Sequence, residues 1–460
     1  MNLIILIPAV VCCVVLARGS ASKALVNVYL PVVLLLPLIY SLRFPHLPPM
    51  TFADTAILPL GAAMLMTQMH RWRWSWMDLG VVLFALSAAI SEGLSSMPAN
   101  GGLQLFAEIT TIVLPYMAAK LLIEQQVVGD QPVRKLLVER MVVLLAIVAC
   151  ISVYDFVAGL SSWQTVFRPF FPAEQLAEVA SQWPMQMRWG FGRIAGPFAH
   201  AILAGIVFLM GLIYCLWLRR FEPGWGSRRV VEGLPVTVRG LALTAIVAGL
   251  LMTQSRGPWA GVGLALLFAL LVRILSWGKA VMVFAVMVAV LSVVAYNYGS
   301  KYTEKEISQA SDVEQRDAIY RRDLLKNYLP IVMERKAFGW GISNYPAVNG
   351  QKSLDNHFLM LAVTQGLIGL GLFLAIVAGT VARLFRLAAR PMAPEDRGLV
   401  FAQLAILTGV LTTITTVFLG EQALILFFMM VGWVQAMNPA GARVGSGDAV
   451  APFKFHRVLT

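Results

Sequence analysis

The chain has 460 residues, of which 58% are hydrophobic and only 13% are charged, and its mean hydropathy is +0.74. A soluble protein of this size carries about 25% charged residues, so the composition excludes the soluble-domain classes. The formal net charge of +12 would suggest a nucleic-acid partner in a soluble chain, but in a membrane protein Lys and Arg in short loops report orientation. We therefore expect an all-α, polytopic integral membrane protein with no nucleic-acid partner.

The apolar residues form long blocks, and a bilayer core requires about 20 mostly apolar residues per helix. The first block has no basic residue before Arg18, which favours a retained membrane helix over a signal peptide. We expect a single membrane domain over residues 1–460 with twelve or thirteen transmembrane helices. The candidate segments are 2–17, 25–42, 53–68, 78–95, 103–122, 137–158, 197–218, 239–254, 258–275, 279–297, 357–382, 398–418 and 422–437.

Lys and Arg residues gather in alternate loops between these segments. The opposite short loops, residues 96–102 and 419–420, contain none. Because loops rich in Lys and Arg stay in the cytoplasm, we expect the basic loops and the C-terminus to be cytoplasmic. The basic residues of these loops are Arg18, Lys23, Arg71, Arg73, Lys120, Arg134, Lys135, Arg140, Arg219, Arg220, Arg228, Arg229, Arg239, Arg273, Lys279, Arg383, Arg386, Arg390 and Arg397.

Two long connections then fall on the outer side, a first loop over residues 159–196 and a large loop over residues 298–356. Long loops can translocate regardless of their charge, so the nine Lys and Arg of the large loop do not contradict the orientation. Within it, residues 314–336 are typical of an amphipathic helix, which we expect to cap the bundle. Its basic face is as compatible with solvation as with a function. The apolar side chains are Ile319, Leu324, Leu325, Tyr328, Ile331 and Val332, and the basic ones are Arg316, Arg321, Arg322 and Lys326.

Three groups of polar residues lie where outer segments enter membrane helices, at residues 187–200, 253–259 and 338–358. Arginine presents a rigid fork of donors that suits phosphate, and helix starts add unpaired backbone N–H groups. A lone arginine at such a boundary is usually explained by contact with lipid headgroups. Several on one side indicate a site for a membrane-bound phosphate or pyrophosphate. The arginines at these entries are Arg188, Arg193 and Arg256.

Two histidines lie beside these entries. His357 follows Asp355 and Asn356, which could orient it as a general base, although a lone histidine is usually structural. His200 is as compatible with helix packing as with ligand binding. The sequence has no HExxH motif and its four cysteines lie in apolar segments, so we expect no metal site. The absence of a Walker A motif predicts no nucleotide partner.

In this order, the motifs resemble the O-antigen ligase / O-antigen polymerase superfamily of bacterial envelope enzymes. The resemblance covers about residues 190–380. It consists of Arg193-x-x-Gly196-x-Phe198-x-His200, Ser255-Arg256-Gly257, a long outer loop, Gly339-x-Gly341, and Asn356-His357-Phe358-Leu359 with Gly366 and Gly369.

The resemblance implies a GT-C-like glycosyltransferase of the bacterial inner membrane with a periplasmic active site and no cofactor. Its donor would be an undecaprenyl-pyrophosphate-linked glycan. Ligases of this superfamily pass the glycan to lipid A–core, and polymerases pass it to another lipid-linked repeat unit.

The resemblance also implies roles for individual residues. Arg193 and Arg256 would hold the donor pyrophosphate, and His357 would activate the acceptor hydroxyl. Arg322 and Arg321 would add positive charge from the large outer loop. Substrate contacts are further expected from Arg188, from Asn356 and from His200, which stands where family members often carry asparagine.

Three functions remain open on the sequence. The outer loops lack a convincing pair of Arg-x10-Gly motifs, which favours a ligase slightly over a polymerase. A flippase for lipid-linked sugars would need charges throughout the membrane depth. Glu108, Asp155 and Glu421 are the few acidic residues near the spans, whereas the arginines gather at one face, and this asymmetry favours an enzyme.

Overall fold

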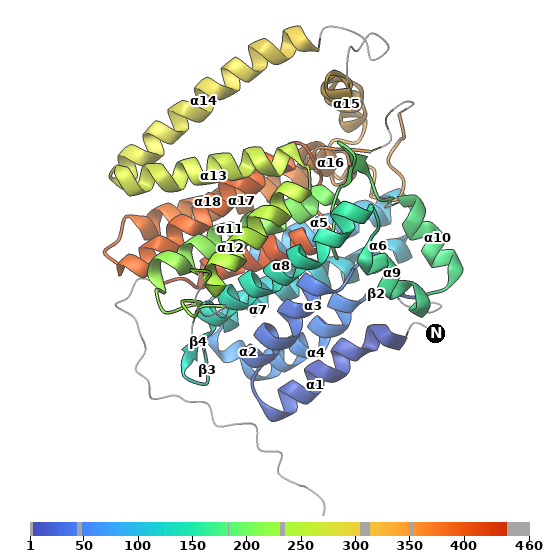
Figure 1. Ribbon diagram of the computed structural model, residues 1–460. Helices are drawn as coiled ribbons and strands as arrows, with labels where there is room; N and C mark the ends of the chain where they lie inside the picture. The colour runs from blue at the N-terminus through green and yellow to red at the C-terminus, as the bar shows by residue number, and fades with distance from the viewer. Residues whose placement is uncertain are drawn as a thin grey trace, which may run out of the picture.

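The computed structural model describes residues 3–43, 48–124, 126–182, 184–230, 235–303, 313–348, 351 and 353–438. Over these residues the chain is a bundle of α-helices, which confirms the predicted all-α class (Figure 1). Short antiparallel hairpins pair β1 (Ser41–Leu42) with β2 (Met50–Thr51), β3 (Val127–Val128) with β4 (Gln131–Pro132), and β5 (Met187–Arg188) with β6 (Phe191–Gly192).

The helices follow the predicted segments in order. The first part of the chain forms α1 (Ile7–Arg18), α2 (Ala21–Ala24), η2 (Leu25–Tyr29), α3 (Leu30–Leu35), α4 (Phe52–Thr67), α5 (Trp76–Ser95), α6 (Pro98–Glu108), η4 (Ile109–Val113) and α7 (Leu114–Leu122). The middle forms α8 (Val133–Ala158), α9 (Ser162–Phe167), α10 (Ala173–Gln182), α11 (Ala201–Phe221), α12 (Val238–Met252), α13 (Arg256–Ile274) and α14 (Trp277–Tyr302). The last part forms α15 (Val313–Glu334), α16 (His357–Thr364), α17 (Gly366–Ala388), α18 (Pro394–Ile414) and α19 (Glu421–Ala436).

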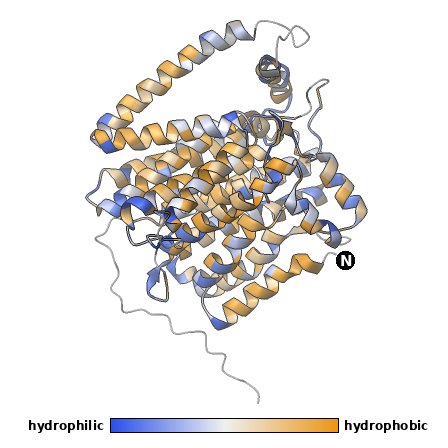
Figure 2. Ribbon diagram, in the orientation of Figure 1, coloured by the Kyte–Doolittle hydropathy of each residue, from blue (hydrophilic) through white to orange (hydrophobic). Residues whose placement is uncertain are grey.

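Within the described ranges, eight helical segments are long and apolar enough to cross a membrane, and five more apolar helices are shorter. Each of the thirteen predicted segments overlaps one of these helices, although the segment 25–42 is helical only as far as Leu35. Many outward-facing side chains are apolar, as on α14, where only 6% of the stretch Trp277–Val294 is buried. Hydrophobic residues cover the helices and hydrophilic residues gather at their ends (Figure 2). The fold is therefore that of a multi-pass membrane protein.

The predicted segment 357–382 is not one helix but two, α16 and α17, separated at Gln365. Gly366 has φ +69°, and a Cβ on it would lie 2.2 Å from the Ala337 carbonyl oxygen. The chain turns at this break, between α16 and α17. Just after it, the backbone N–H groups of Leu367 and Ile368 donate to the carbonyls of Lys336 and Ala337 at 2.7 and 3.3 Å.

Polar contacts join the predicted cytoplasmic loops to one another at one end of the bundle. Lys120 Nζ lies 2.6 Å from Asp78 Oδ1 and donates to the Arg73 carbonyl at 2.8 Å. Arg134 pairs with Glu395 at 2.9 Å and with Asp396 at 2.5 Å. The loops that charge counting groups together are thus neighbours in space.

The predicted outer segments meet at the other end. Gln422 Nε2 donates to the Pro197 carbonyl at 3.0 Å, and Gln175 Nε2 donates to the Ser41 carbonyl at 3.0 Å. Trp163 Nε1 donates to the Leu35 carbonyl at 2.8 Å. Figure 1 shows α10, α15 and α16 at this end and the β3–β4 hairpin at the opposite one.

Small residues allow two helices to approach closely near the outer end. A Cβ on Gly261 of α13 would lie 2.5 Å from the Gly409 carbonyl oxygen of α18, and one on Gly257 would lie 2.5 Å from Thr416 Oγ1. This is the close helix packing that Gly-x-x-x-Gly patterns give inside membranes. It fixes the position of Arg256, the first residue of α13, relative to the end of α18.

The predicted large outer loop contains a helix, α15, where the amphipathic helix is expected. Its buried residues Ile319, Leu324, Tyr328 and Val332 are at most 2% exposed, and most of them form a second apolar cluster with side chains of α16. Leu325, expected on the apolar face, is 52% exposed, so that assignment was wrong. The four basic residues predicted for the other face, Arg316, Arg321, Arg322 and Lys326, are exposed.

Candidate active site

The candidate site is built around the short turn between α12 and α13. Thr253, Gln254 and Ser255 are at most 3% exposed, and Gln254 has φ +48°. A non-glycine residue in this left-handed region costs about 1–3 kcal/mol, and such strain often occurs at functional sites. Gln254 Oε1 is buried and has no hydrogen-bond partner within the described part of the chain.

Two of the predicted arginines hold this turn. Arg193 donates from Nε to the Thr253 carbonyl at 3.3 Å and from Nη2 to Ser255 Oγ at 3.0 Å, and it also contacts Gln186 Oε1. Arg188 Nη1 donates to the Gln254 carbonyl at 3.0 Å. Both come from the β5–β6 hairpin and the residue after it, and positive φ at Trp189 and Gly190 forms its tight turn.

Arg256 follows the same turn as the first residue of α13, and its side chain is exposed. The structure therefore brings Arg188, Arg193 and Arg256 to one turn at one end of the bundle. The start of α13 adds backbone N–H groups and the positive end of the helix dipole. This combination of fixed guanidiniums and a helix N-terminus suits an anion.

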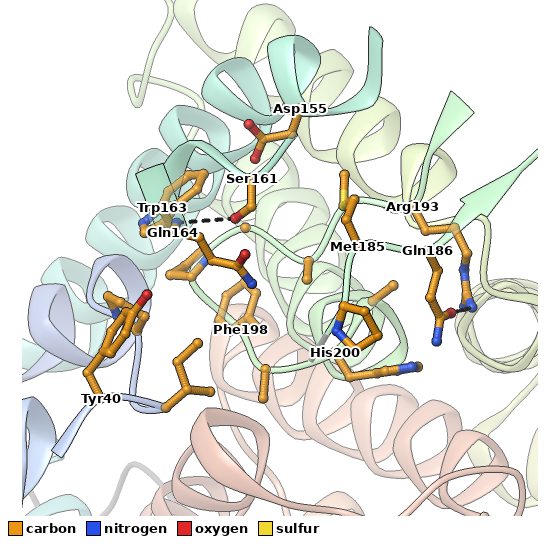
Figure 3. Close-up of a pocket in the computed structure, with 18 residues that line it drawn as sticks. Tyr40, Asp155, Ser161, Trp163, Gln164, Met185, Gln186, Arg193, Phe198 and His200 are labelled. Atoms are coloured by element: carbon orange, nitrogen blue, oxygen red, sulfur yellow. Dashed lines mark hydrogen bonds between the residues drawn. The ribbon is translucent and has the colours of Figure 1, made fainter. Parts of the chain in front are cut away.

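A pocket opens beside Arg193 (Figure 3). Its volume is about 700 Å³, counting the space that opens to solvent. Arg193, Gln186 and His200 lie along one side, and Asp155, Ser161 and Gln164 lie along another. The walls come from the chain just after α3, the end of α8, both ends of the predicted first outer loop and the entry to α11.

His200 caps α11, because its Nδ1 accepts a hydrogen bond from the Ile202 backbone N–H at 3.2 Å. Burial, and then the charge of Arg193, lower the pKa of His200 to about 4. The ring is therefore neutral near pH 7. Since Nδ1 accepts, the proton lies on Nε2, which can donate into the pocket.

His357 is the first residue of α16 and is 5% exposed. Its Nδ1 accepts from the Leu419 backbone N–H at 3.2 Å, and its ring packs edge-on against Phe373 at 4.9 Å between centroids. Nε2 is buried without a partner in the described structure. The neutral ring thus carries its proton on Nε2 in this conformation.

The neighbours expected to orient His357 have other partners. Asn356 Oδ1 caps α16 by accepting from the Leu359 N–H at 3.1 Å, and Asp355 accepts from Ser353 Oγ at 2.7 Å. Leu419 orients the histidine ring instead. Sequence alone gives no sign of this contact, because it joins residues 62 positions apart.

The segment that ends α18 and begins α19 connects the two halves of the site. Thr413 Oγ1 donates to the Gly257 carbonyl at 3.4 Å, Leu419 bonds to His357, and Gln422 bonds to the Pro197 carbonyl. One segment therefore touches the start of α13, the start of α16 and the entry to α11. Arg256, His357 and His200 stand at these three starts.

A clasp between Glu92 and residues 341–343 anchors the loop that follows α15. Glu92 Oε2 accepts from the backbone N–H groups of Ile342 at 2.7 Å and Ser343 at 3.2 Å. Gly341 has φ +74°, and a Cβ there would lie 2.7 Å from Glu92 Oε2. The Gly339-x-Gly341 motif therefore allows the backbone to approach Glu92 closely. The sequence predictions did not include Glu92.

The basic residues of α15 form the second part of the predicted site. Arg322 bonds to Asp323 Oδ1 at 2.6 Å and to the Thr303 carbonyl at the end of α14, whereas Arg321 is exposed on the same helix. The arrangement thus has two parts, the arginine turn with its pocket and the α15–α16 cap with His357 and Asn356.

Gln254 is a site residue that the sequence predictions missed, and its position next to Ser255-Arg256 was the available signal. Tyr40 and Asp155 of the pocket had no distinctive motif.

Comparison with protein families gives one match. Residues 240–374 match a family model described as O-antigen ligase. The matched segment contains Arg256, α13, α14, α15, the whole of α16 with His357 and the start of α17. It excludes Arg188, Arg193 and His200. No curated protein matches the chain.

Proposed function

We propose that this chain is a membrane glycosyltransferase of the O-antigen ligase superfamily, which transfers a glycan from undecaprenyl pyrophosphate to lipid A–core at the periplasmic face. The match of residues 240–374 to the O-antigen ligase family model supports the proposal. The observation that carries the proposal is the convergence of Arg188, Arg193 and Arg256 on one strained turn at a helix start. The C-terminus would then be cytoplasmic, in the bacterial inner membrane.

The arginine turn serves as the donor pyrophosphate site in this proposal. Arg256 and Arg193 would bind the phosphate oxygens, and Arg188 supports the turn through the Gln254 carbonyl. When the glycosidic bond breaks, its electron pair passes to the pyrophosphate oxygen. Fixed guanidiniums stabilise that developing charge without rearranging, and this is the largest effect that such a site can supply.

His357 would accept the proton of the acceptor hydroxyl as its oxygen bonds to the anomeric carbon. In the structure Nδ1 is occupied by Leu419 N–H and Nε2 carries the proton. The histidine can therefore act as a base only after Nδ1 is released from Leu419. We propose that substrate binding moves the segment around Leu419, which also touches the arginine turn through Thr413.

The exposed basic face of α15 is proposed to face the acceptor. Arg321, Arg322 and Lys326 are exposed there, whereas the opposite face of the helix packs on α16. Lipid A–core carries anionic groups, which suit a basic surface. Asn356 caps α16, the helix that begins with His357.

The experiment that tests the function uses purified protein, undecaprenyl-pyrophosphate-linked glycan and EDTA, without nucleotide. One reaction contains lipid A–core as acceptor, and the other contains only the donor. A lipid A–core product of higher mass supports the ligase. Lengthening of the donor glycan would instead make the protein a polymerase, and no product from well-folded protein would favour a flippase.

A further inference from the structure

The pocket beside Arg193 contains polar groups that the pyrophosphate site does not use. Tyr40 is 1% exposed and lines the pocket, but its hydroxyl makes no hydrogen bond within the described residues. The Tyr29 hydroxyl is fully buried, whereas the Tyr40 hydroxyl is not. Figure 3 shows the Tyr40 hydroxyl on the side of its ring that faces Gln164.

Two further groups face the same space. Asp155 is 2% exposed, and its Oδ1 accepts from the Ser162 backbone N–H at 2.8 Å and from the Ser162 hydroxyl, which leaves Oδ2 for another donor. His200 offers its Nε2–H, since its Nδ1 is occupied by Ile202. The pocket thus presents a carboxylate acceptor, a ring donor and a hydroxyl that can do both.

The rest of the pocket wall is rigid and largely apolar. Trp163 is 7% exposed and is fixed by its bond to the Leu35 carbonyl, and Phe198 is 3% exposed. An apolar wall with a few placed polar groups is typical of a specific small-molecule site.

The chemistry of these groups selects one kind of ligand. Asp155 would repel a second phosphate, and buried polar groups facing an alkyl chain would lose hydrogen bonds to water without compensation. A sugar ring offers several hydroxyls that both donate and accept, together with C–H faces that pack on apolar walls. Arg193 belongs to the pocket and to the arginine turn alike, so a ligand with both a sugar and a phosphate could span them.

We propose that this pocket binds the first sugar of the donor, the one attached to the pyrophosphate, with Tyr40, Asp155 and His200 as its hydrogen-bonding residues. The inference rests on the proposed function, because it takes the pyrophosphate to lie on Arg193 and Arg256. It assigns the selection of the donor sugar to residues that lie before the segment of the family match.

The test compares the affinities of two lipids for the purified full-length protein in nanodiscs. One is undecaprenyl pyrophosphate without sugar, and the other is the lipid-linked glycan extracted from the cell that makes the protein. Tyr40→Phe removes one hydroxyl and keeps the ring. Loss of one hydrogen bond should weaken binding of the glycan-bearing lipid about two- to tenfold and leave the sugar-free lipid unaffected.

Tyr29→Phe is the matched control, because Tyr29 is also a buried tyrosine with an unpartnered hydroxyl but does not line the pocket. It should change neither affinity. Asp155→Asn, which keeps an acceptor for Ser162, should reproduce the selective loss. Equal affinities of wild type and Tyr40→Phe for the glycan-bearing lipid would overturn the sugar subsite, whereas failure of wild type to bind either lipid would overturn the proposed function itself.

Discussion

At the scale of single residues, the proposed reaction depends on histidines whose hydrogen bonds determine which ring nitrogen carries the proton. His357 gives the first prediction. His357→Ala should lower the rate of glycan transfer by about 10²–10⁴-fold, the usual contribution of a general base, with donor affinity unchanged. Binding of the donor lipid and single-turnover transfer measure the two separately. If donor affinity falls as much as the rate, His357 is a binding or structural residue.

His200 gives a prediction about pH. Its pKa in the folded protein is about 4, below the ordinary 6.5, because burial disfavours the charged ring. Between these values the unfolded chain binds a proton at this residue that the folded chain does not. The contribution of neutral His200 to stability is therefore fully present above about pH 6.5 and is lost as the pH falls toward 4. His200→Asn keeps a helix-capping side chain and removes the titration. The midpoint of thermal unfolding should therefore fall less between pH 7 and pH 5 in this variant than in wild type; an equal fall would contradict the assignment.

At the scale of elements, the Glu92 clasp should determine whether α15 and α16 stay in place. Gly341→Ala forces a Cβ to within 2.7 Å of Glu92 Oε2 at a left-handed position. We expect a loss of about 1–3 kcal/mol of stability and lower transfer activity. Gly371→Ala is the control, because a Cβ there meets nothing within 4 Å. The midpoint of thermal unfolding, measured for both variants by size-exclusion chromatography after heating, reports their stability. Equal midpoints for the two variants would show that the clasp does not stabilise the fold.

The elements also show what sequence could and could not predict. Apolar length and the distribution of Lys and Arg sufficed for the helices and for the two groups of loops, because each depends on local composition. The break at Gln365 and the exposure of Leu325 were missed, because both follow from how residues 336–337 and α16 pack.

The site was predictable only in part for the same reason. Motifs indicated Arg193 and Arg256, and the structure brings them to one turn. That Leu419, not Asp355, orients His357 depends on a contact between distant segments. The pocket residues Tyr40 and Asp155 come from the chain after α3 and from the last turns of α8, and they form no sequence motif together.

At the scale of the whole molecule, the orientation is open to a direct test. Ala99 and Gly224 are exposed at opposite ends of the bundle, in a predicted outer and a predicted cytoplasmic loop. In a variant without the natural cysteines, Ala99→Cys should react with a membrane-impermeant maleimide in spheroplasts, and Gly224→Cys should react only after lysis. The reverse labelling would place the arginine turn in the cytoplasm and exclude a periplasmic reaction.

In the proposed reaction, arginines at one end of the bundle bind and activate a lipid pyrophosphate donor. The most direct measurement is the rate of transfer to lipid A–core by purified wild type, Arg193→Ala, Arg256→Ala and Arg273→Ala. Arg273 is an exposed arginine at the other end of α13, so it controls for loss of charge on the same helix. We expect rates about 10²–10³-fold lower for Arg193→Ala and Arg256→Ala, and a wild-type rate for Arg273→Ala. Near-normal transfer by both of the first two variants would contradict the account.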